Sequence, residues 1–340
     1  MNIITGLQPT GELHIGNYFG ALEPMKNKVN TLSTKDNFYL MVVDLHALTI
    51  ELDYANYYKQ ILENLRVYLA SGINLQNKNV HLFRQSHIPA HSELNWLLSC
   101  FTYFGEMSRM TQFKDKSKEN NSNINCGLFS YPILMASDIL LYDAEWVPVG
   151  EDQRQHLELA RDIAIRINNK FDSDIFTVPK SYDKQLEFFS QSSPLRIRSL
   201  VNPDKKMSKS NSNLKSKILL SDKPEDAHKK IISATTDNLS NINWDYNNQA
   251  GITNLMQILA LTSNQDIEKV KNDWTGTVRY GDFKKVVADS VSSFLADYQS
   301  RLAQITINDV LHTLSTNEIQ ANLQAKHVLL RFQKQLGIKK

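Results

Sequence analysis

Short apolar runs alternate with stretches of helical periodicity along the first half of the chain. The apolar runs cover residues 2–5, 38–43, 80–83, 146–149 and 175–178, and each is typical of a buried strand. Helical patterns begin near residues 15, 54, 90, 132 and 152. Strands that alternate with helices predict an α/β fold with a doubly wound parallel sheet.

Strand signals nearly vanish after residue 210. Helical patterns follow at 224–234, 252–262, 282–302, 307–314 and 318–336, and Gly337 is suited to end the last of them. We therefore expect two domains, an α/β domain over residues 1–210 and a helical C-terminal domain over 211–340.

Composition narrows the class of protein further. The longest apolar runs fall well short of the about 20 residues that cross a bilayer, and the first 20 residues lack a signal-peptide pattern. We therefore expect a cytoplasmic protein without a membrane partner.

A formal net charge of +2 argues against wrapping DNA but permits a folded RNA that meets local basic patches. Two cysteines, Cys100 and Cys126, are too few for a disulfide framework or a thiolate metal site, and we expect no metal-binding residues.

A glycine-punctuated segment, PTGELHIGN at residues 9–17, joins the first predicted strand to the first helix. Backbone N–H groups at such a helix N-terminus favour phosphate, and His14 and Asn17 add side-chain donors. The alternative is a tight strand-to-helix turn whose glycines serve only packing. Neither GxxxxGK[ST] nor GxGxxG is present, which disfavours P-loop and dinucleotide-binding proteins.

A lysine-rich loop, KMSKS, follows about 190 residues later at 206–210. Lys206 and Lys209, with the hydroxyls of Ser208 and Ser210, can surround a triphosphate whose pyrophosphate is about to leave. Lys116, in the polar run of residues 113–126, is a further candidate. An ordinary charged turn and a solvated surface lysine are the respective alternatives.

Acidic and amide side chains mark the strand end at 146–149. Glu151 and Asp152 in the sequence GEDQ suit ribose hydroxyls or an ammonium group, although both also suit a first helical turn.

Asp138 lies within the apolar sequence MASDILLY, where a buried carboxylate needs a donor. That donor is either a ligand N–H or O–H, or else Ser137 or nearby backbone. His87 and His91 lack a third metal ligand and read as capping or surface residues.

Several segments, in order, resemble the class I aminoacyl-tRNA synthetases, and specifically the bacterial-type tryptophanyl-tRNA synthetases. The similarity covers nearly the whole chain. It is carried by GLQPTGELHIGNYFGAL from Gly6, VVDLHALT from Val42, RMTQFKDKS from Arg109, YPILMASDILLYDAEWVPVGEDQRQH from Tyr131 and SLVNPDKKMSKS from Ser199.

This resemblance implies a Rossmann-type catalytic domain, a helical domain that reads the tRNA anticodon, and a homodimer. The implied reaction joins L-tryptophan to ATP, giving tryptophanyl-adenylate, and then transfers the acyl group to the 3′-terminal adenosine of tRNA(Trp). Mg²⁺ is expected to bind mainly through the ATP phosphates.

The resemblance also implies roles for individual residues. Those expected to bind ATP are Gln8, Pro9, Thr10, Gly16, Asn17, Gly150, Glu151, Asp152, Ile197, Lys206, Met207, Ser208, Lys209 and Ser210. Those expected to surround tryptophan are Gln8, His46, Tyr131, Met135, Asp138, Ile139, Val147, Val149 and Gln153, with Asp138 accepting the indole hydrogen bond. Lys206, Lys209, Lys116 and Asn17 are expected to act in catalysis.

Two positions depart from the family pattern: His14 stands where many bacterial relatives have Thr, and Asn211 where relatives commonly have Asp. Three other functions stay open. Tyrosyl-tRNA synthetases share the architecture, although GEDQ and MASDI favour tryptophan. A non-catalytic RNA-binding relative would not need the intact lysine loop. A small nucleotidyltransferase would not need a long helical domain.

Overall fold

A parallel sheet lies at the centre of the computed structural model, which describes residues 1–9, 11–33, 35–111, 125–189, 196–209 and 211–340. The strands β1 (Asn2–Leu7), β2 (Asn37–Val42) and β3 (Val80–Arg84) are hydrogen-bonded in the order β1-β2-β3. All three were predicted, and the α/β class with a parallel sheet is confirmed.

The two later strand predictions fare differently. Trp146 forms a single parallel bridge to Ile3, with Ile4 N donating to the Trp146 carbonyl at 3.0 Å, so the chain runs beside β1 there without forming a longer strand. The strand predicted at 175–178 is wrong. The Asn168 side chain accepts from the amides of Ile175 and Phe176 at 3.1 and 3.0 Å, and a side chain thus replaces the neighbouring strand as the hydrogen-bond partner.

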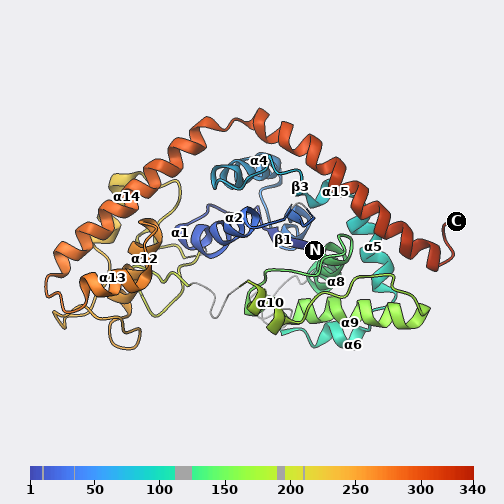
Figure 1. The fold of residues 1–340 in the computed structure, drawn as a ribbon, viewed down its shortest axis with the longest axis horizontal. Helices are drawn as coiled ribbons and strands as arrows, with labels where there is room; N and C mark the ends of the chain where they lie inside the picture. The colour runs from blue at the N-terminus through green and yellow to red at the C-terminus, as the bar shows by residue number, and fades with distance from the viewer. Residues whose placement is uncertain (10, 34, 112–124, 190–195, 210) are drawn as a thin grey trace.

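Helices surround this sheet (Figure 1). The α-helices are α1 (Ile15–Asn17), α2 (Glu23–Asn30), α3 (Asp44–Ala47), α4 (Tyr54–Ala70), α5 (Ala90–Ser99), α6 (Phe104–Ser108), α8 (Cys126–Leu140), α9 (Arg154–Phe171), α10 (Tyr182–Phe188), α11 (Pro224–Ile232), α12 (Ala250–Thr262), α13 (Ile267–Trp274), α14 (Tyr280–Gln304) and α15 (Ile307–Gln335). A π-helical turn, η1 (Tyr18–Leu22), joins α1 to α2, and the 3₁₀ turns are η2 (Gln85–His87), η3 (Glu151–Gln153) and η4 (Leu214–Ser216).

Two helices differ from their predicted bounds by more than two residues. α8 begins at Cys126, before the predicted start at 132, because the Asn125 side chain accepts from Leu128 N at 2.8 Å and caps the helix. α15 is one helix, where a break was expected between 314 and 318. The polar residues in the gap bond within the helix, with Asn317 Nδ2 donating to the Thr313 carbonyl at 2.8 Å.

The strands are buried on both faces, as expected for a parallel sheet covered by helices. Phe38, Leu40 and Val42 pack into one apolar cluster with α4, α12 and α14, whereas Tyr39 and Met41 pack into a second cluster with α5, α8 and α9. The alternation of side chains along β2 therefore divides the core between the two sides of the sheet.

The last two helices form a long arch over the molecule, from α13 at one foot to α5 and α9 at the other (Figure 1). α15 packs against β3, α4 and α5. Glu318 on α15 accepts from Arg84 on β3 in two hydrogen bonds of 2.7 and 3.0 Å, and both side chains are largely buried. The helix thus lies directly on the first part of the chain, and the boundary after residue 210 stays a prediction.

None of the helices within the described ranges has the length and apolar character needed to cross a membrane.

Candidate active site

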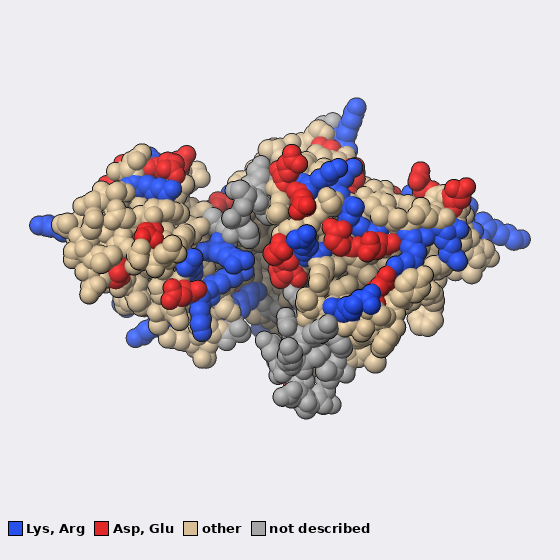
Figure 2. Space-filling model, turned by 90° about the horizontal axis from the view of Figure 1, so that it is seen from below, with Lys and Arg blue, Asp and Glu red and all other residues tan. Residues whose placement is uncertain are grey.

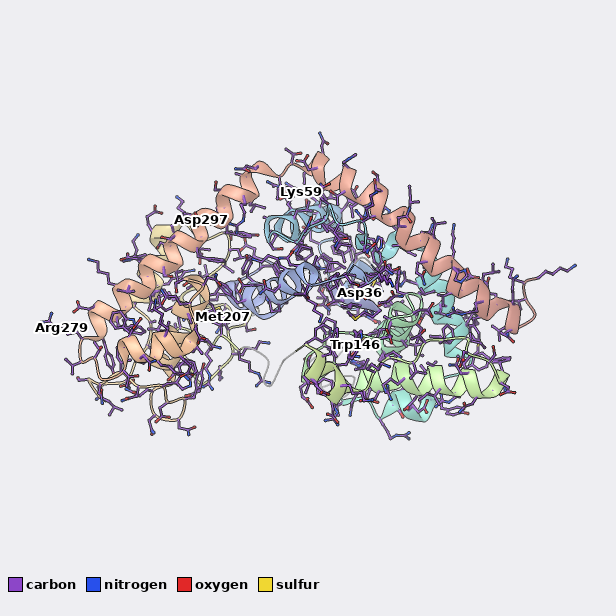
Figure 3. All side chains as sticks on the ribbon, in the orientation of Figure 1. Asp36, Lys59, Trp146, Met207, Arg279 and Asp297 are labelled. Carbon is purple, nitrogen blue, oxygen red and sulfur yellow. The ribbon has the colours of Figure 1, made fainter. Side chains whose placement is uncertain are left out.

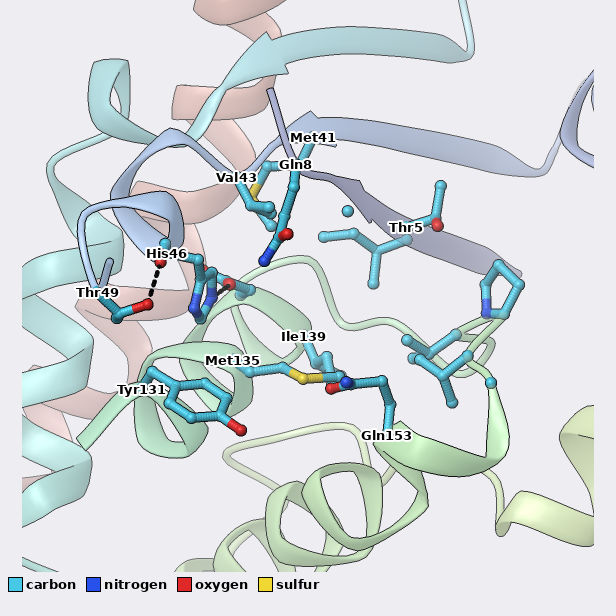
Figure 4. A pocket seen from close by; sticks show the side chains of 17 residues that line it. Thr5, Gln8, Met41, Val43, His46, Thr49, Tyr131, Met135, Ile139 and Gln153 are labelled. Atoms are coloured by element: carbon cyan, nitrogen blue, oxygen red, sulfur yellow. Dashed lines mark hydrogen bonds and ion pairs between the residues drawn. The ribbon is translucent and has the colours of Figure 1, made fainter. Parts of the chain in front are cut away.

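A cavity of about 360 Å³ opens at the carboxyl ends of β1 and β2 (Figure 4). This edge is where open parallel sheets bind ligands. Every residue expected to surround an aromatic amino acid lines it: Gln8, His46, Tyr131, Met135, Asp138, Ile139, Val147, Val149 and Gln153. The wall also includes Gly150, which was expected to bind ATP, and residues that were not predicted: Ile4, Thr5, Gly6, Met41, Val43, Thr49 and Pro148. Most of the lining is apolar, so the few polar groups stand out.

Asp138 is the buried charge of this wall, only 3% exposed. Its carboxylate accepts from His46 Nε2 at 2.8 Å, from His91 Nδ1 at 2.7 Å and from Gln85 Nε2 at 2.8 Å. Burial by itself would raise the pKa of Asp138, but the hydrogen bonds from the two histidines outweigh it and hold the pKa at about 2. The carboxylate is therefore ionised across the physiological range.

The donors of Asp138 correct two sequence interpretations. Ser137 does not satisfy the carboxylate, because its hydroxyl donates to the Ile133 carbonyl at 3.0 Å. His91 was read as a capping or surface residue, yet it is fully buried. The available local signal was the apolar residues Ile88, Ala90 and Leu94 around it, which are also buried.

A second hydrogen-bonded chain lies across the cavity. The Tyr131 hydroxyl and His156 Nε2 lie 3.0 Å apart, His156 Nδ1 and Gln153 Oε1 lie 2.8 Å apart, and Gln153 Nε2 donates to Asp152 at 2.9 Å. An amide oxygen only accepts, so His156 donates from Nδ1 and its Nε2 accepts a hydrogen bond from the Tyr131 hydroxyl. His156 was missed; its position three residues after Gln153, on the inner face of α9, is the available signal.

The glycine turn and the lysine loop lie together. Leu220 N donates to the Leu13 carbonyl at 2.9 Å and Ile15 N donates to the Ile218 carbonyl at 3.0 Å, which ties the turn to the segment after the loop. Gly11 has a positive φ of 65°, and a Cβ built there would lie 3.7 Å from Lys209 Cδ. Lys209 therefore lies over the turn.

His14 and Asn17 form a reciprocal cap at the start of α1. His14 Nδ1 accepts from Asn17 N at 3.3 Å, and Asn17 Oδ1 accepts from His14 N at 3.1 Å. The proton of the neutral ring is then on Nε2, which agrees with the proposal that His14 can donate. Burial, followed by the charges of Lys209, Lys217 and Lys206, lowers the pKa of His14 to about 4.

The lysine loop is held by its backbone. Met207 is buried, and its amide donates to the Ile197 carbonyl at 3.0 Å. The buried ammonium of Lys217 donates to the carbonyls of Lys209 and Asn211 at 2.6 and 2.9 Å. Burial lowers the pKa of Lys209 to about 8, so its side chain is mostly cationic at neutral pH. Figure 3 shows Met207 near α1, and its side chain shares an apolar cluster with Ile15 of that helix.

The remaining predicted residues are placed as follows. Gly150 lines the cavity, Pro9 is buried, and Ile197 packs near Gly16, while Glu151, Asp152, Lys206 and Ser208 are exposed. Thr10, Ser210 and Lys116 lie outside the described residues.

Figure 2 shows a hollow between the two halves of the molecule, with Lys and Arg side chains gathered beside it on the half that holds α12–α14. A cationic rim next to an apolar cavity suits an anionic substrate joined to an aromatic one.

No group of three His, Cys, Asp or Glu side chains within the described ranges converges as a metal site. Cys100 and Cys126 are exposed thiols.

Comparison with known proteins agrees with this geometry. A family model described as tRNA synthetases class I (W and Y) matches residues 1–296. The tryptophan–tRNA ligase of Caldanaerobacter subterraneus subsp. tengcongensis is 43% identical over 336 residues, covering 99% of this chain and 98% of the relative. Tryptophanyl-tRNA synthetase from Mycoplasma pneumoniae superposes with a TM-score of 0.81 at 33% identity, covering 99% of this chain and 97% of that one. The Campylobacter jejuni enzyme, complexed with ADP and tryptophan, gives a TM-score of 0.80 at 29% identity, with 99% and 100% covered.

The low pKa of His14 predicts an acid-sensitive fold. Between pH 6.5 and 4 the unfolded chain protonates His14 while the folded protein does not, so stability falls with falling pH, by at most about 3 kcal/mol. His14→Thr keeps a capping hydroxyl without the titration, and we expect a smaller loss between pH 7 and 4.5 in urea unfolding. His327→Gln, at an exposed position, should behave as the parent; equal acid losses in all three proteins would contradict the assignment.

Proposed function

The chain belongs to the class I tRNA synthetases for tryptophan and tyrosine, and we propose that it joins L-tryptophan to tRNA(Trp) in the cavity beside Asp138. It is an aminoacyl-tRNA ligase, as the resemblance of its sequence indicated. The observation that carries the assignment to tryptophan is a single ionised acceptor, Asp138, in a mostly apolar wall.

The chemistry of the indole ring explains this choice. Indole nitrogen is only a donor, so its pocket has to offer an acceptor among apolar walls. Phenylalanine would leave the carboxylate without that partner, which is costly in a buried site. Tyrosine has to be rejected by the shape of the cavity, whose walls include Met135 and Ile139.

The reaction proceeds in two steps. The tryptophan carboxylate attacks the α-phosphorus of ATP, forming the acyl-adenylate and releasing pyrophosphate. A hydroxyl of the terminal tRNA ribose then attacks the acyl carbon, forming the ester and releasing AMP. The protein needs no nucleophile of its own, and its contribution is positioning and charge stabilisation.

Individual residues have distinct roles in this scheme. The ammonium groups of Lys206 and Lys209 balance the charge that grows on the leaving pyrophosphate, and His14 Nε2 and the capped helix start at Asn17 donate to phosphate. Lys116 would add a cation on the α-phosphate side. Gly150, Glu151 and Asp152 hold the ribose, while Gln153 and Tyr131 orient the amino group of tryptophan through the chain that includes His156.

Mg²⁺ would bind mainly to the phosphates of ATP and not to side chains of the protein. The phosphate end of the site is built from lysines, a donor set that fits phosphate oxygens and not a bare cation. The ion would neutralise phosphate charge when bound, while the residues of this chain bind and orient the phosphates.

We further propose that residues 1–210 carry catalysis and that the helical part, 211–340, reads the tRNA anticodon. The Lys and Arg side chains beside the hollow in Figure 2 support a tRNA partner. The protein would act in the cytoplasm, where tRNA is charged.

We propose a homodimer because an apolar surface is exposed on α5 and at the start of α6. Trp96, Tyr103 and Phe104 are 69%, 63% and 76% exposed, and the Phe104 ring lies 5.3 Å from that of Phe129 on α8. Aromatic surfaces of this kind mark interfaces, and a second copy of the same chain is the commonest occupant.

Pyrophosphate exchange tests the substrate. We expect tryptophan to stimulate exchange of labelled pyrophosphate into ATP, and tyrosine to do so far less. Asp138→Ala should raise the KM for tryptophan by about tenfold to hundredfold, with little change in the KM for ATP. Ser137→Ala is the matched control on the same helix. Exchange driven equally by tyrosine, or unchanged tryptophan use in Asp138→Ala, would reject the assignment.

Lys209 predicts a pH limit on ATP use. Because its pKa is about 8, kcat/KM for ATP should fall as the pH rises above about 8. Lys209→Arg keeps its charge and should extend activity to higher pH, whereas Lys209→Ala should slow adenylate formation by about 10²-fold or more with a modest change in tryptophan affinity. A single-turnover rate in Lys209→Ala equal to that of the parent would contradict this role.

Sedimentation velocity tests the dimer. The 38.9 kDa chain should sediment as a dimer, and Trp96→Glu should shift it to a monomer because a charge would be buried in the interface. Val278→Glu, at a 64% exposed position on the other half, serves as control. A parent protein that sediments as a monomer would exclude the interface.

A further inference from the structure

His91 lies behind the cavity wall and does not line the cavity. It is fully buried at the start of α5, and its ring stacks on Phe83 of β3 with 6.2 Å between the ring centroids. The imidazole therefore cannot touch an amino acid in the cavity. Among the residues that the structure describes, its imidazole nitrogens meet Asp138 and Tyr142.

These contacts define the direction of both hydrogen bonds. An ionised carboxylate only accepts, so His91 Nδ1 carries a proton and donates to Asp138 Oδ1 over 2.7 Å. In the neutral ring Nε2 is then an acceptor, and the Tyr142 hydroxyl donates to it over 2.9 Å. Tyr142, His91 and Asp138 form a buried chain in which each polar group is satisfied.

The other donors of Asp138 approach from different elements. His46 Nε2 on α3 donates to Oδ2, and Gln85 Nε2 in η2 lies within 3.0 Å of both oxygens. Gln85 is itself oriented, because its Oε1 accepts from the amides of Leu45 and His46 at 3.2 and 3.4 Å. The carboxylate thus accepts four hydrogen bonds, two of them from the single Gln85 nitrogen, and a ligand N–H takes over the Oδ2 site that Gln85 shares.

We propose that His91 is a positioning residue for amino-acid selection, which fixes Asp138 so that the Oδ2 acceptor site shared with Gln85 meets the indole N–H. The inference rests on the proposed role of Asp138 in binding tryptophan. His91 acts from behind the wall: it occupies Oδ1 and prevents the carboxylate from rotating, while Tyr142 prevents the imidazole from turning over.

Charge supports the same role. Among the described residues, the titratable groups that face Asp138 are His46 from α3, His91 from α5 and Tyr142 just after α8. Burial raises the pKa of Asp138, and the two histidines lower it. In a variant without His91, one of the two histidine hydrogen bonds that lower the pKa of Asp138 is lost. The pKa of Asp138 then moves upward towards neutral pH. A protonated Asp138 would offer the indole a weaker acceptor.

Three variants separate positioning from packing. His91→Leu removes the donor, whereas His91→Asn places an amide near the former Nδ1 and keeps a donor to Asp138. His81→Leu is a matched control, because His81 is a buried histidine that stacks on Tyr39 at 5.0 Å, away from Asp138. Thermal unfolding of each variant reports whether it is folded at the assay temperature.

Pyrophosphate exchange is measured between pH 5.5 and 9 with tryptophan and with its benzothiophene analogue, in which sulfur replaces the indole N–H. In His91→Leu we expect the KM for tryptophan to rise about tenfold to hundredfold, with a smaller change for the analogue and for ATP. Its kcat/KM for tryptophan should also increase with pH across the neutral range, whereas the parent profile is flat there apart from the fall above about pH 8. His91→Asn should recover much of the loss.

Several results would overturn the proposal. Equal losses for tryptophan and its analogue would indicate a packing role, and so would equal KM values in His91→Leu and His91→Asn. A parent-like KM and pH profile in His91→Leu would also reject it. These outcomes differ from failure of the proposed function, in which the parent protein itself would not exchange pyrophosphate with tryptophan.

Discussion

The backbone pairing of Leu13 and Ile15 with Ile218 and Leu220 is the constraint on which the site depends. It joins a turn near the start of the chain to the segment that follows the lysine loop. The turn supplies a helix N-terminus and the loop supplies cations, and neither alone surrounds a triphosphate. Because Lys217 also holds two carbonyls of the loop, backbone contacts set the chain path that places Lys206 and Lys209 beside the turn.

At the amino-acid end of the site, a buried negative charge has to be stabilised. A lone carboxylate in an apolar wall is unfavourable, and Asp138 is tolerated because His46, Gln85 and His91 donate to it. The same donors that stabilise the charge also limit how many further partners it accepts. Stability of the wall and selection among substrates therefore draw on the same hydrogen bonds.

Much of this arrangement could be predicted from the sequence, and the failures have physical causes. Apolar runs located β1, β2 and β3, and the family resemblance named the residues around the cavity. The strand expected at 175–178 was wrong because the backbone amides of Ile175 and Phe176 donate to the Asn168 side chain instead of to a neighbouring strand. No local sequence pattern reveals this contact. His91 was misread and His156 was missed because the sequence around each histidine gives no sign of its hydrogen-bond partners, which come from distant segments. Thr10, Lys116 and Ser210 stay predictions.

The return of α15 to the sheet has a consequence for the order of events during synthesis. Phe83, Leu94 and Leu98 share a cluster with Val328, Leu329 and Phe332. On a ribosome the surface of β3 and α5 that α15 covers stays exposed until residue 332 has emerged, although β3 was made some 250 residues earlier. The contacts that close it have large sequence separation, which is the property that slows folding. Completion of the first-made part of the protein thus waits for the last-made helix.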